Sequence, residues 1–245
     1  LQGDLGQDRK DTGMLVKTFL EKFKNMKNPP ALIMKTSHSG FSVIDRRQIL
    51  KKISDIRQSV EAKSYPNIYV LHGDLDDEEM NELYNHPKVK VHISFTKGEG
   101  FGRPLLEASL SEKPIMVSNW SGQLDFLNKN NAILLPGTLT DVHPSALPDE
   151  MRVDKAQWFT VNYQYAAQMM FKVFKEYRSH TLAAKRLAMG NKIFSLDMMT
   201  SKFSNILDQY LPLFEEQPQA VGLKLPKLKK VEAPKLKLPK LKKVT

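Results

Sequence analysis

The sequence predicts an α/β domain built around a doubly wound parallel sheet, followed by helices and a basic tail. Along the first 135 residues, short segments that are apolar throughout alternate with amphipathic segments of helical period. Strands that are apolar on both faces are typical of a parallel sheet that helices cover on each side. In such a sheet the ligand binds at the carboxyl ends of the strands, so site residues are sought there.

The predicted helices and strands follow in order. The first helix is expected over 13–27, and the two prolines after Asn28 end it, because proline cannot continue a helix. Further helices are expected over 42–62, from Asp76 onward, over 103–111 and over 123–128. Strands are expected over 31–34, 67–71, 89–95, 114–118 and 132–135.

After Pro136 the character of the sequence changes. Residues 136–151 are rich in Pro, Thr and Asp and predict a loop, and residues 158–213 have a helical pattern, with helices over 163–177, 182–191 and 196–211. We expect Trp158, Phe159 and Tyr163 to pack these helices onto the sheet. Four methionines are expected to fill the helix core: Met169, Met170, Met198 and Met199. The predicted domains are 1–152 for the ligand-binding domain, 153–216 for the helices and 217–245 for the tail.

The tail carries most of the net charge. Of the net charge of +10, residues 223–245 contribute +8, through nine lysines and one glutamate. The segment LKLPKLKKV occurs twice, at 223–231 and 236–244, and its prolines prevent a continuous helix, so an extended, disordered tail is expected. Two interpretations stay open: the lysines bind an anionic surface, either a membrane or a nucleic acid, or they only keep the chain solvated.

The composition excludes several classes of function. Cysteine is absent, which removes disulfides, thiolate chemistry and cysteine–zinc sites and fits a cytoplasmic protein, with membrane association left open. None of the six histidines lies at a metal-binding spacing such as H-x-x-H, so no metal is expected. The sequence has no run of 18 apolar residues that would predict a membrane span.

Residues 97–107, KGEGFGRPLLE, carry the clearest functional signal. They follow a predicted strand and open a predicted helix, whose unpaired N–H groups and partial positive charge favour phosphate. Gly98, Gly100 and Gly102 let a ligand approach the backbone, and Arg103 adds a guanidinium for a phosphate oxygen. The motif lacks the GK[ST] of a Walker loop and the spacing of GxGxxG, so a nicotinamide-dependent oxidoreductase is disfavoured.

The two carboxylates of this motif narrow the ligand further. Glu99 lies in the loop and Glu107 about one turn inside the helix, so both can face one ligand at the end of a strand. Carboxylates accept hydrogen bonds from hydroxyl groups. A diphosphate between two hydroxylated sugars fits this layout, and a nucleotide sugar is such a ligand. No cofactor is expected beyond this donor substrate.

The segment EGFGRPLLEA, Glu99–Ala108, resembles the E-x7-E signature of the group 1 glycosyltransferases of family 4, which have the GT-B fold. The small residues Ser121-Gly122, the acidic stretch LHGDLDDEEMNELY at 71–84 and the basic stretch RKDTGMLVKTF at 9–19 are similar to further motifs of that family. The resemblance implies the C-terminal, Rossmann-like half of the fold, which binds the donor.

The resemblance also implies roles for these residues. Glu99 is the catalytic carboxylate, near the reacting carbon of the donor sugar. Arg9 and Lys10 neutralise the leaving diphosphate, which lowers the barrier electrostatically. The family retains anomeric configuration and generally needs no metal; the acceptor here, a glycan, lipid or protein, stays unassigned. The full donor-binding set is Arg9, Lys10, Gly100, Phe101, Gly102, Arg103 and Glu107.

The sequence departs from the family in the basic stretch. The family usually carries an Arg several residues before the Lys, where this chain has Asp4, so Arg9 is assigned instead. An acceptor domain is expected before residue 1, and the chain, which begins with Leu, is expected to be a fragment that binds donor without completing transfer. Two alternatives stay open: a non-catalytic sugar-nucleotide-binding module, and a structural module tethered through its tail.

Three other polar residues lie on or beside the predicted strands. Lys35 ends a strand on the expected ligand side and is a weak phosphate candidate. His72 follows a strand and lies either at the mouth of the site or in a structural role. His92 lies within a strand and is expected to be structural.

Overall fold

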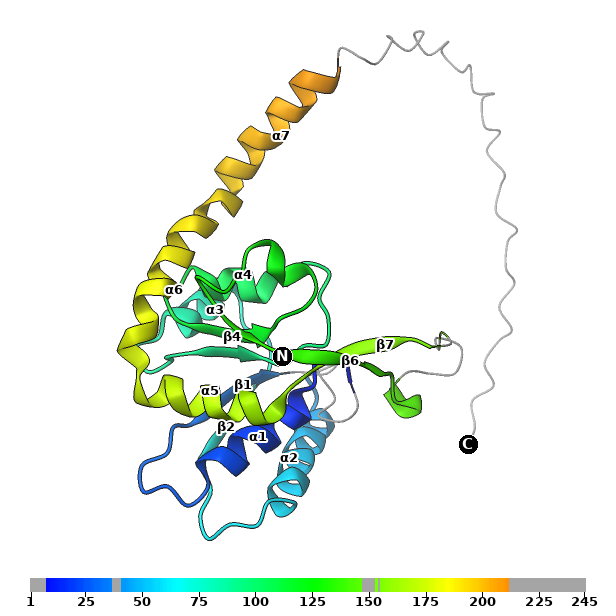
Figure 1. Cartoon of the computed structure of the whole chain (residues 1–245), viewed down its shortest axis with the longest axis vertical. Helices are drawn as coiled ribbons and strands as arrows, with labels where there is room; N and C mark the ends of the chain where they lie inside the picture. The colour runs from blue at the N-terminus through cyan, green and yellow to red at the C-terminus, as the bar shows by residue number, and fades with distance from the viewer. Residues whose placement is uncertain (1–7, 37–40, 147–152, 154, 212–245) are drawn as a thin grey trace, which may run out of the picture. The chain divides into compact units, whose positions relative to one another are not determined.

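The computed structural model describes residues 8–36, 41–146, 153 and 155–211 (Figure 1). The predicted tail at 217–245 and the end of the predicted loop, 147–151, lie outside the described residues. The helices are α1 (Thr12–Phe23), α2 (Val43–Gln58), α3 (Asp77–Asn85), α4 (Arg103–Ser109), α5 (Tyr163–Lys175), α6 (Tyr177–Asn191) and α7 (Leu196–Tyr210). The 3-10 helices are η1 (Gly122–Asp125), η2 (Pro144–Ala146) and η4 (Lys192–Phe194). The strands are β1 (Leu32–Thr36), β2 (Ile68–His72), β3 (His92–Ser94), β4 (Ile115–Ser118), β5 (Ile133–Leu135), β6 (Gly137–Asp141) and β7 (Gln157–Val161).

The first five strands form two parallel sheets. β1 pairs with β2, and β3, β4 and β5 lie in that order in the second sheet. The predicted alternation of helices with short parallel strands is therefore confirmed. The sequence led us to expect one sheet, and in the described part of the chain the strands divide between two, since no ladder there joins β1 to β3.

Helix α1 belongs to the cores of both sheets. Leu15, Phe19 and Phe23 pack in the core of the three-stranded sheet, while Val16 and Leu20 pack in the core of the β1–β2 pair. Within each set the spacing is four residues, which places the set on one stripe of the helix. The predicted amphipathic helix is thus confirmed, although it ends at Phe23 and not at residue 27 before the prolines, and its two stripes join the two cores.

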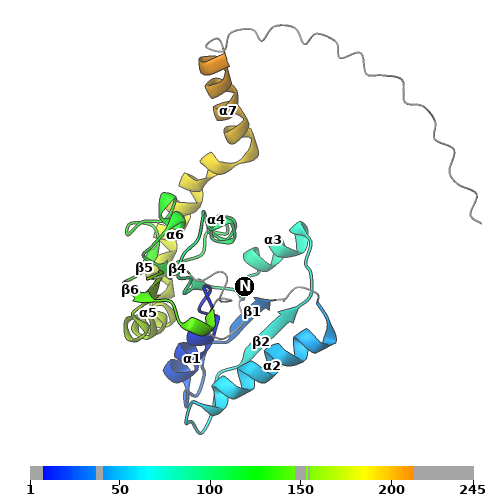
Figure 2. The same ribbon diagram turned by 90° about the vertical axis from the view of Figure 1, so that its right-hand side faces the viewer.

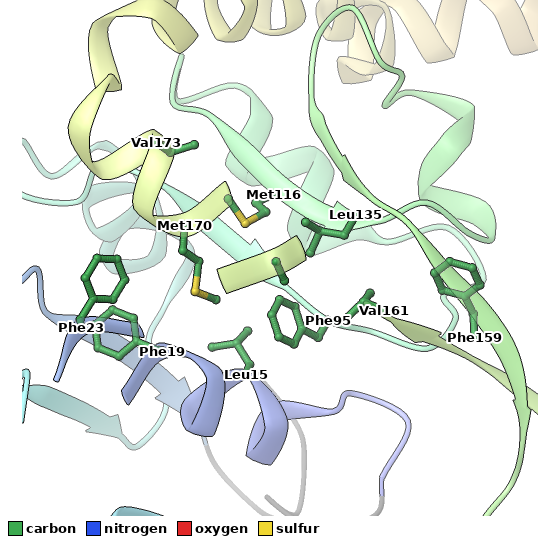
Figure 3. Packing of buried hydrophobic residues seen from close by; sticks show 11 residues of the cluster. Leu15, Phe19, Phe23, Phe95, Met116, Leu135, Phe159, Val161, Met170 and Val173 are labelled. Atoms are coloured by element: carbon green, nitrogen blue, oxygen red, sulfur yellow. The ribbon is translucent and has the colours of Figure 1, made fainter. Parts of the chain in front are cut away.

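Strand β4 is buried on both faces. Met116 points into the core that α1 and α5 cover, close to Leu135 and Met170 (Figure 3). Ile115 and Val117 point the other way, into a core that they share with residues of α4 and α6. Successive strand residues face opposite sides of a sheet, so this sheet is covered by helices on both faces, as the sequence predicts.

The β1–β2 pair is covered differently. One face packs against α1 and α2 (Figure 2), through residues that include Met34 and Ile49. Ile33, Tyr69 and Leu71 are on the alternate positions and are exposed. The expectation that these strands are buried on both faces is therefore wrong for this pair in the described structure.

An antiparallel hairpin replaces part of the predicted loop and the first residues of the region, 158–213, in which a helical pattern was predicted. β6 and β7 pair from Gly137 opposite Val161 to Asp141 opposite Gln157. The sequence QWFTV of β7 is rich in aromatic and β-branched residues, which favour strands, and this local preference decides the structure there. The hairpin positions Phe159 and Val161 in the core with α5.

The helices after the hairpin agree with the prediction, although α6 begins earlier, at Tyr177. Phe159 and Tyr163 pack at the core beneath them, as expected. Of the four methionines, Met170 is buried and Met169 is half-buried, whereas Met198 and Met199 are exposed, so the prediction of core filling is wrong for that last pair.

The chain divides into two compact units, Leu1–Met199 and Thr200–Thr245. Within the second unit, the description covers the remainder of α7 and Leu211. Every residue of α7 is exposed. Among the described helices, none has both the length and the apolar character needed to cross a bilayer.

Candidate functional site

The loop between β3 and α4 carries the KGEGFG motif and begins the candidate site. Gly102 precedes α4 with a φ of 89°, a left-handed conformation that favours glycine. A Cβ atom added there would lie 3.3 Å from Cβ of Gln123, so the loop packs closely against η1. Pro104 lies in the first turn of α4, where proline is tolerated.

The loop after β4 holds the backbone of Glu99 in place. The Ser121 hydroxyl donates to the Glu99 carbonyl at 2.6 Å and accepts from the Glu99 N–H at 3.1 Å. The Gly122 N–H also donates to the Glu99 carbonyl, at 3.0 Å. A Cβ atom on Gly122 would collide with the Gly100 carbonyl, so only glycine allows the two loops this approach. The small-residue stretch recognised in the sequence therefore fixes the backbone of the motif.

The Glu99 carboxylate lies between two cations that come from the loop before α1. Lys10 Nζ forms an ion pair and hydrogen bond with Oε1 of Glu99, and Arg9 Nη1 lies 3.2 Å from Oε2. Arg9 also donates to the Gly98 carbonyl, and the Thr96 hydroxyl donates to Oε1 of Glu99 at 2.8 Å. The structure thus brings together three of the predicted site residues from segments that are 89 residues apart.

These contacts keep Glu99 charged. Burial alone would raise the pKa of Glu99, but the hydrogen bonds from Lys10 and Thr96 and the charges of Lys10 and Arg9 outweigh it and lower the pKa. The side chains of Arg9, Lys10 and Glu99 are 45%, 20% and 14% exposed, so solvent and ligands can reach the group.

Glu107 and Arg103 form a second ion pair, within α4. Arg103 Nε lies 2.8 Å from Oε1 of Glu107, at the i, i+4 spacing of neighbours on a helix. The Tyr84 hydroxyl donates to the other carboxylate oxygen at 3.4 Å, and burial together with Glu107 raises the pKa of Tyr84 to about 12. Arg103, assigned to a phosphate, therefore contacts Glu107 in this structure.

Gly100 and Phe101 lie between these two groups in the sequence. A Cβ atom at Gly100 would meet nothing within 4 Å, so there is open space beside this part of the loop. The Phe101 ring is half exposed and packs against Phe126 and Phe194, with ring centroids 5.2 Å and 5.8 Å away. These aromatic contacts anchor the middle of the loop.

The three weaker candidates have structural partners. His72 Nε2 lies 2.7 Å from Oδ2 of Asp45, which favours the structural role for this histidine. Lys35 donates to the Gly73 carbonyl at 2.6 Å. His92 is largely buried, and burial together with the charge of Lys113 lowers its pKa to about 4, as suits a structural histidine. Within the described residues, no group of three or more histidines and carboxylates is placed to hold a metal ion.

Residues 54–152 match the model of the family Glycosyl transferases group 1. The matched span includes Glu99, Arg103 and Glu107, whereas Arg9 and Lys10 lie before it. The family match therefore covers the motif, and the structure adds the two cations that contact Glu99.

Solved glycosyltransferases share the fold. Anabaena HepE in complex with UDP-glucose is 12% identical, with a TM-score of 0.53 over 82% of this chain and 46% of that one. A glycosyltransferase from Rickettsia africae is 19% identical, with a TM-score of 0.52 over 81% of this chain and 44% of that one. The pneumococcal O-GlcNAc transferase GtfA in complex with UDP and GlcNAc is 18% identical, with a TM-score of 0.55 over 86% and 35%.

This likeness shows that the fold is similar to that of GT-B glycosyltransferases. The chain spans less than half the length of each of these three structures. A comparison with curated proteins finds no match.

Several residues at this site escape a reading of the sequence. Thr96 contacts Glu99 directly, and Asp11, Lys97 and Tyr163 contact one another beside it. The adjacency of Asp11 to the basic pair was available as a signal. Tyr163 gives none, because it lies 152 residues from the aspartate that it contacts.

Proposed function

We propose that this chain is the donor-binding part of a glycosyltransferase that moves a sugar from a nucleotide-diphosphate sugar to an acceptor. The convergence of Arg9 and Lys10 on Glu99 carries this proposal. Two cations and a charged carboxylate at a reachable loop suit a ligand with both phosphate and hydroxyl groups. The match of residues 54–152 to the group 1 family supports the same reaction.

The proposed roles follow from charge and position. Transfer breaks the bond between the anomeric carbon and the diphosphate oxygen and forms a bond from that carbon to an acceptor oxygen, whose proton passes to the departing diphosphate. Arg9 and Lys10 stabilise the negative charge that develops on the departing diphosphate. Glu99, held ionised by its neighbours, accepts hydrogen bonds from the sugar hydroxyls.

The remaining assignments concern the nucleotide. Glu107 binds the ribose hydroxyls, which requires it to exchange contacts with Arg103 and Tyr84 for contacts with the ligand. The backbone from Gly100 to Gly102, beside open space, accommodates the diphosphate. Retention of configuration and independence from metal follow from the resemblance of the E-x7-E motif. The solved relatives HepE and GtfA, described with UDP, favour UDP among the nucleotides.

Calorimetric titration with UDP, GDP, ADP and their glucose conjugates tests this proposal. We expect one nucleotide to bind and Glu107→Ala to weaken it about tenfold, which corresponds to about 1.4 kcal/mol. Glu21→Ala, which removes an exposed glutamate from α1, is the matched control and should leave the affinity unchanged. If no nucleotide binds to the wild type, the donor site is not formed by this chain.

The alternative is a module that binds a nucleotide sugar without catalysing transfer. It stays open because the chain spans less than half of each of the solved structures HepE and the Rickettsia glycosyltransferase. A module that only binds would take up the nucleotide sugar and never release free sugar from it. Prolonged incubation with radiolabelled donor and simple glycoside acceptors tests this alternative, because any labelled transfer product would rule out a module that only binds.

A further inference from the structure

Asp11 is a buried acid in an unusual position. It immediately precedes α1, where aspartate normally caps the helix by accepting from a backbone N–H. Here the Asp11 side chain makes no such hydrogen bond, and its backbone is left-handed, with a φ of 51°. The residue is only 2% exposed. A side chain that gives up a favourable cap is held by other contacts.

Those contacts come from two other parts of the chain. Oδ2 of Asp11 accepts a hydrogen bond from the Tyr163 hydroxyl at 2.7 Å, and Oδ1 lies 3.5 Å from Lys97 Nζ. The Lys97 side chain is 9% exposed, and its ammonium lies 5.6 Å from the centre of the Trp158 ring. We call Asp11, Lys97 and Tyr163 the Asp11 clamp.

The Asp11 clamp adjoins the group of charged side chains at the candidate site, which consists of Arg9, Lys10 and Glu99. Asp11 is the residue after Lys10, and Lys97 is two residues before Glu99. The Lys97 N–H also donates to the Arg9 carbonyl at 2.8 Å. The same two loops are therefore joined twice: by buried contacts through the clamp, and by reachable contacts between the cations and Glu99.

A buried ion pair contributes little net stability, because desolvation of the two charges offsets their attraction. The pair does fix the relative position of the two side chains, because separating them would leave an uncompensated charge in the protein interior. Burial raises the pKa of Asp11, and the contacts with Tyr163 and Lys97 act in the opposite direction. The clamp is thus better suited to holding the loops in register than to stabilising the fold.

We propose that the Asp11 clamp positions Lys10 and Arg9 against Glu99, so that Asp11, Lys97 and Tyr163 are positioning residues for the nucleotide-diphosphate site. This proposal rests on the proposed function. Asp11 and Lys97 are buried and Tyr163 is half-buried; in this proposal they act through the loop backbone, which sets where the two cations meet a diphosphate.

The test measures nucleotide affinity of the full chain and uses Tyr163→Phe. This change removes the hydroxyl and keeps the ring, which packs against Phe95 with centroids 6.0 Å apart. We expect the Kd for UDP, or for GDP or ADP if one of these binds more tightly, to rise about three- to tenfold. Tyr165→Phe, an exposed tyrosine on the same helix, is the control and should leave Kd unchanged.

A second measurement separates positioning from a general structural role. Lys10→Ala is combined with Tyr163→Phe in a double-mutant cycle. If the clamp acts through Lys10, the tyrosine change adds less than about twofold once Lys10 is gone, because the group that it positions is absent. Independent structural effects would multiply instead, and multiplication would overturn the proposal.

The outcomes distinguish the two hypotheses. Binding by the wild type with unchanged Kd for Tyr163→Phe overturns the clamp alone. No binding by the wild type overturns the proposed function and the clamp with it. If Tyr163→Phe does not fold, Asp11→Asn decides, because the amide still accepts from Tyr163 but carries no charge for Lys97; an unchanged Kd there would also count against the clamp.

Discussion

At the scale of single residues, the site is organised around one charge. Glu99 accepts from Lys10 and Thr96 and lies beside Arg9, so its ionised form is favoured within the folded chain. The same contacts that lower the pKa of Glu99 therefore stabilise the folded state whenever the carboxylate is charged. Acid titration of stability is a direct way to observe this arrangement without any ligand.

We predict that Glu99→Gln lowers the free energy of unfolding at pH 7 and that this loss shrinks in acid. A carboxyl group with a lowered folded pKa stabilises the fold above its unfolded value, and the contribution is lost as pH falls through the folded value. The ordinary value is 4.5, so the difference between wild type and variant should narrow below about pH 4.5. Urea unfolding of both proteins at several pH values measures this difference in the free energy of unfolding.

The control for this titration is Glu21→Gln, on the exposed side of α1. Its free energy of unfolding should follow the wild-type curve at every pH. A difference for Glu99→Gln that stays constant from pH 7 to pH 3 would mean that Glu99 contributes by packing and not by charge.

The sequence motifs predicted Glu99, Arg9 and Lys10 as site residues but did not predict the contacts of Lys97 and Tyr163 with Asp11. Glu99 and the basic pair stand in recognisable motifs, so their types and spacing were enough to single them out. Lys97 belongs to the same motif as Glu99, yet nothing in the spacing shows that it turns inward to Asp11. Which side a loop residue faces depends on the packing beneath it, and periodicity describes only helices and strands.

At the scale of elements, the loop after β3 carries Glu99, the loop after β4 holds its backbone, and the loop before α1 supplies Arg9 and Lys10. The loop after β4 holds the Glu99 backbone through Ser121 and Gly122, and this contact requires glycine at 122. The two strands are neighbours in the sheet, so their loops emerge side by side. The precision of the site therefore depends on how closely these loops approach.

We predict that Gly122→Ala weakens nucleotide binding at least tenfold. The new Cβ would collide with the Gly100 carbonyl and lie 2.9 Å from the Glu99 carbonyl, so the two loops must separate. Calorimetric titration with the preferred nucleotide measures the loss. The matched control is Gly190→Ala in α6, where a Cβ meets nothing within 4 Å and alanine is the better helix former.

An unchanged affinity for Gly122→Ala would mean that the two loops can part without moving the groups that bind the ligand. Circular dichroism spectra of both variants should match the wild type. If Gly122→Ala alone loses secondary structure, the collision acts on the fold, and the site is tested instead through Ser121→Ala, which removes the hydroxyl bridge and adds no bulk.

The elements show why sequence patterns predict most helices and strands of the described chain and miss the β6–β7 hairpin. Helices such as α1 and strands such as β4 carry periodicities that tertiary packing reinforces, and both were predicted. The β6–β7 hairpin was missed because Pro, Thr and Asp around it indicate a loop. Its pairing depends on contacts between residues 137–141 and 157–161, which no local pattern can show.

At the scale of the whole molecule, charge and structure are distributed unequally. Residues 223–245 carry +8 of the net charge of +10, and the candidate site lies in the other unit, Leu1–Met199. The site and the basic sequence are therefore distinct features of one chain. The tethering interpretation assigns the function to the basic sequence, and the donor-binding interpretation assigns it to the site.

Deletion of residues 223–245 separates these interpretations. We predict that nucleotide affinity stays within about twofold of the full chain, because every residue assigned to the site or to its support, up to Tyr163, precedes the deleted segment. Retention on a cation-exchange column should fall sharply, since the net charge of the chain drops from +10 to +2. A chain that keeps its tail but has alanine for the nine lysines is the matched control for length. Loss of nucleotide binding in the truncated chain, with the melting temperature unchanged, would show that the basic sequence takes part in donor binding and would contradict the assignment of the site to the first unit.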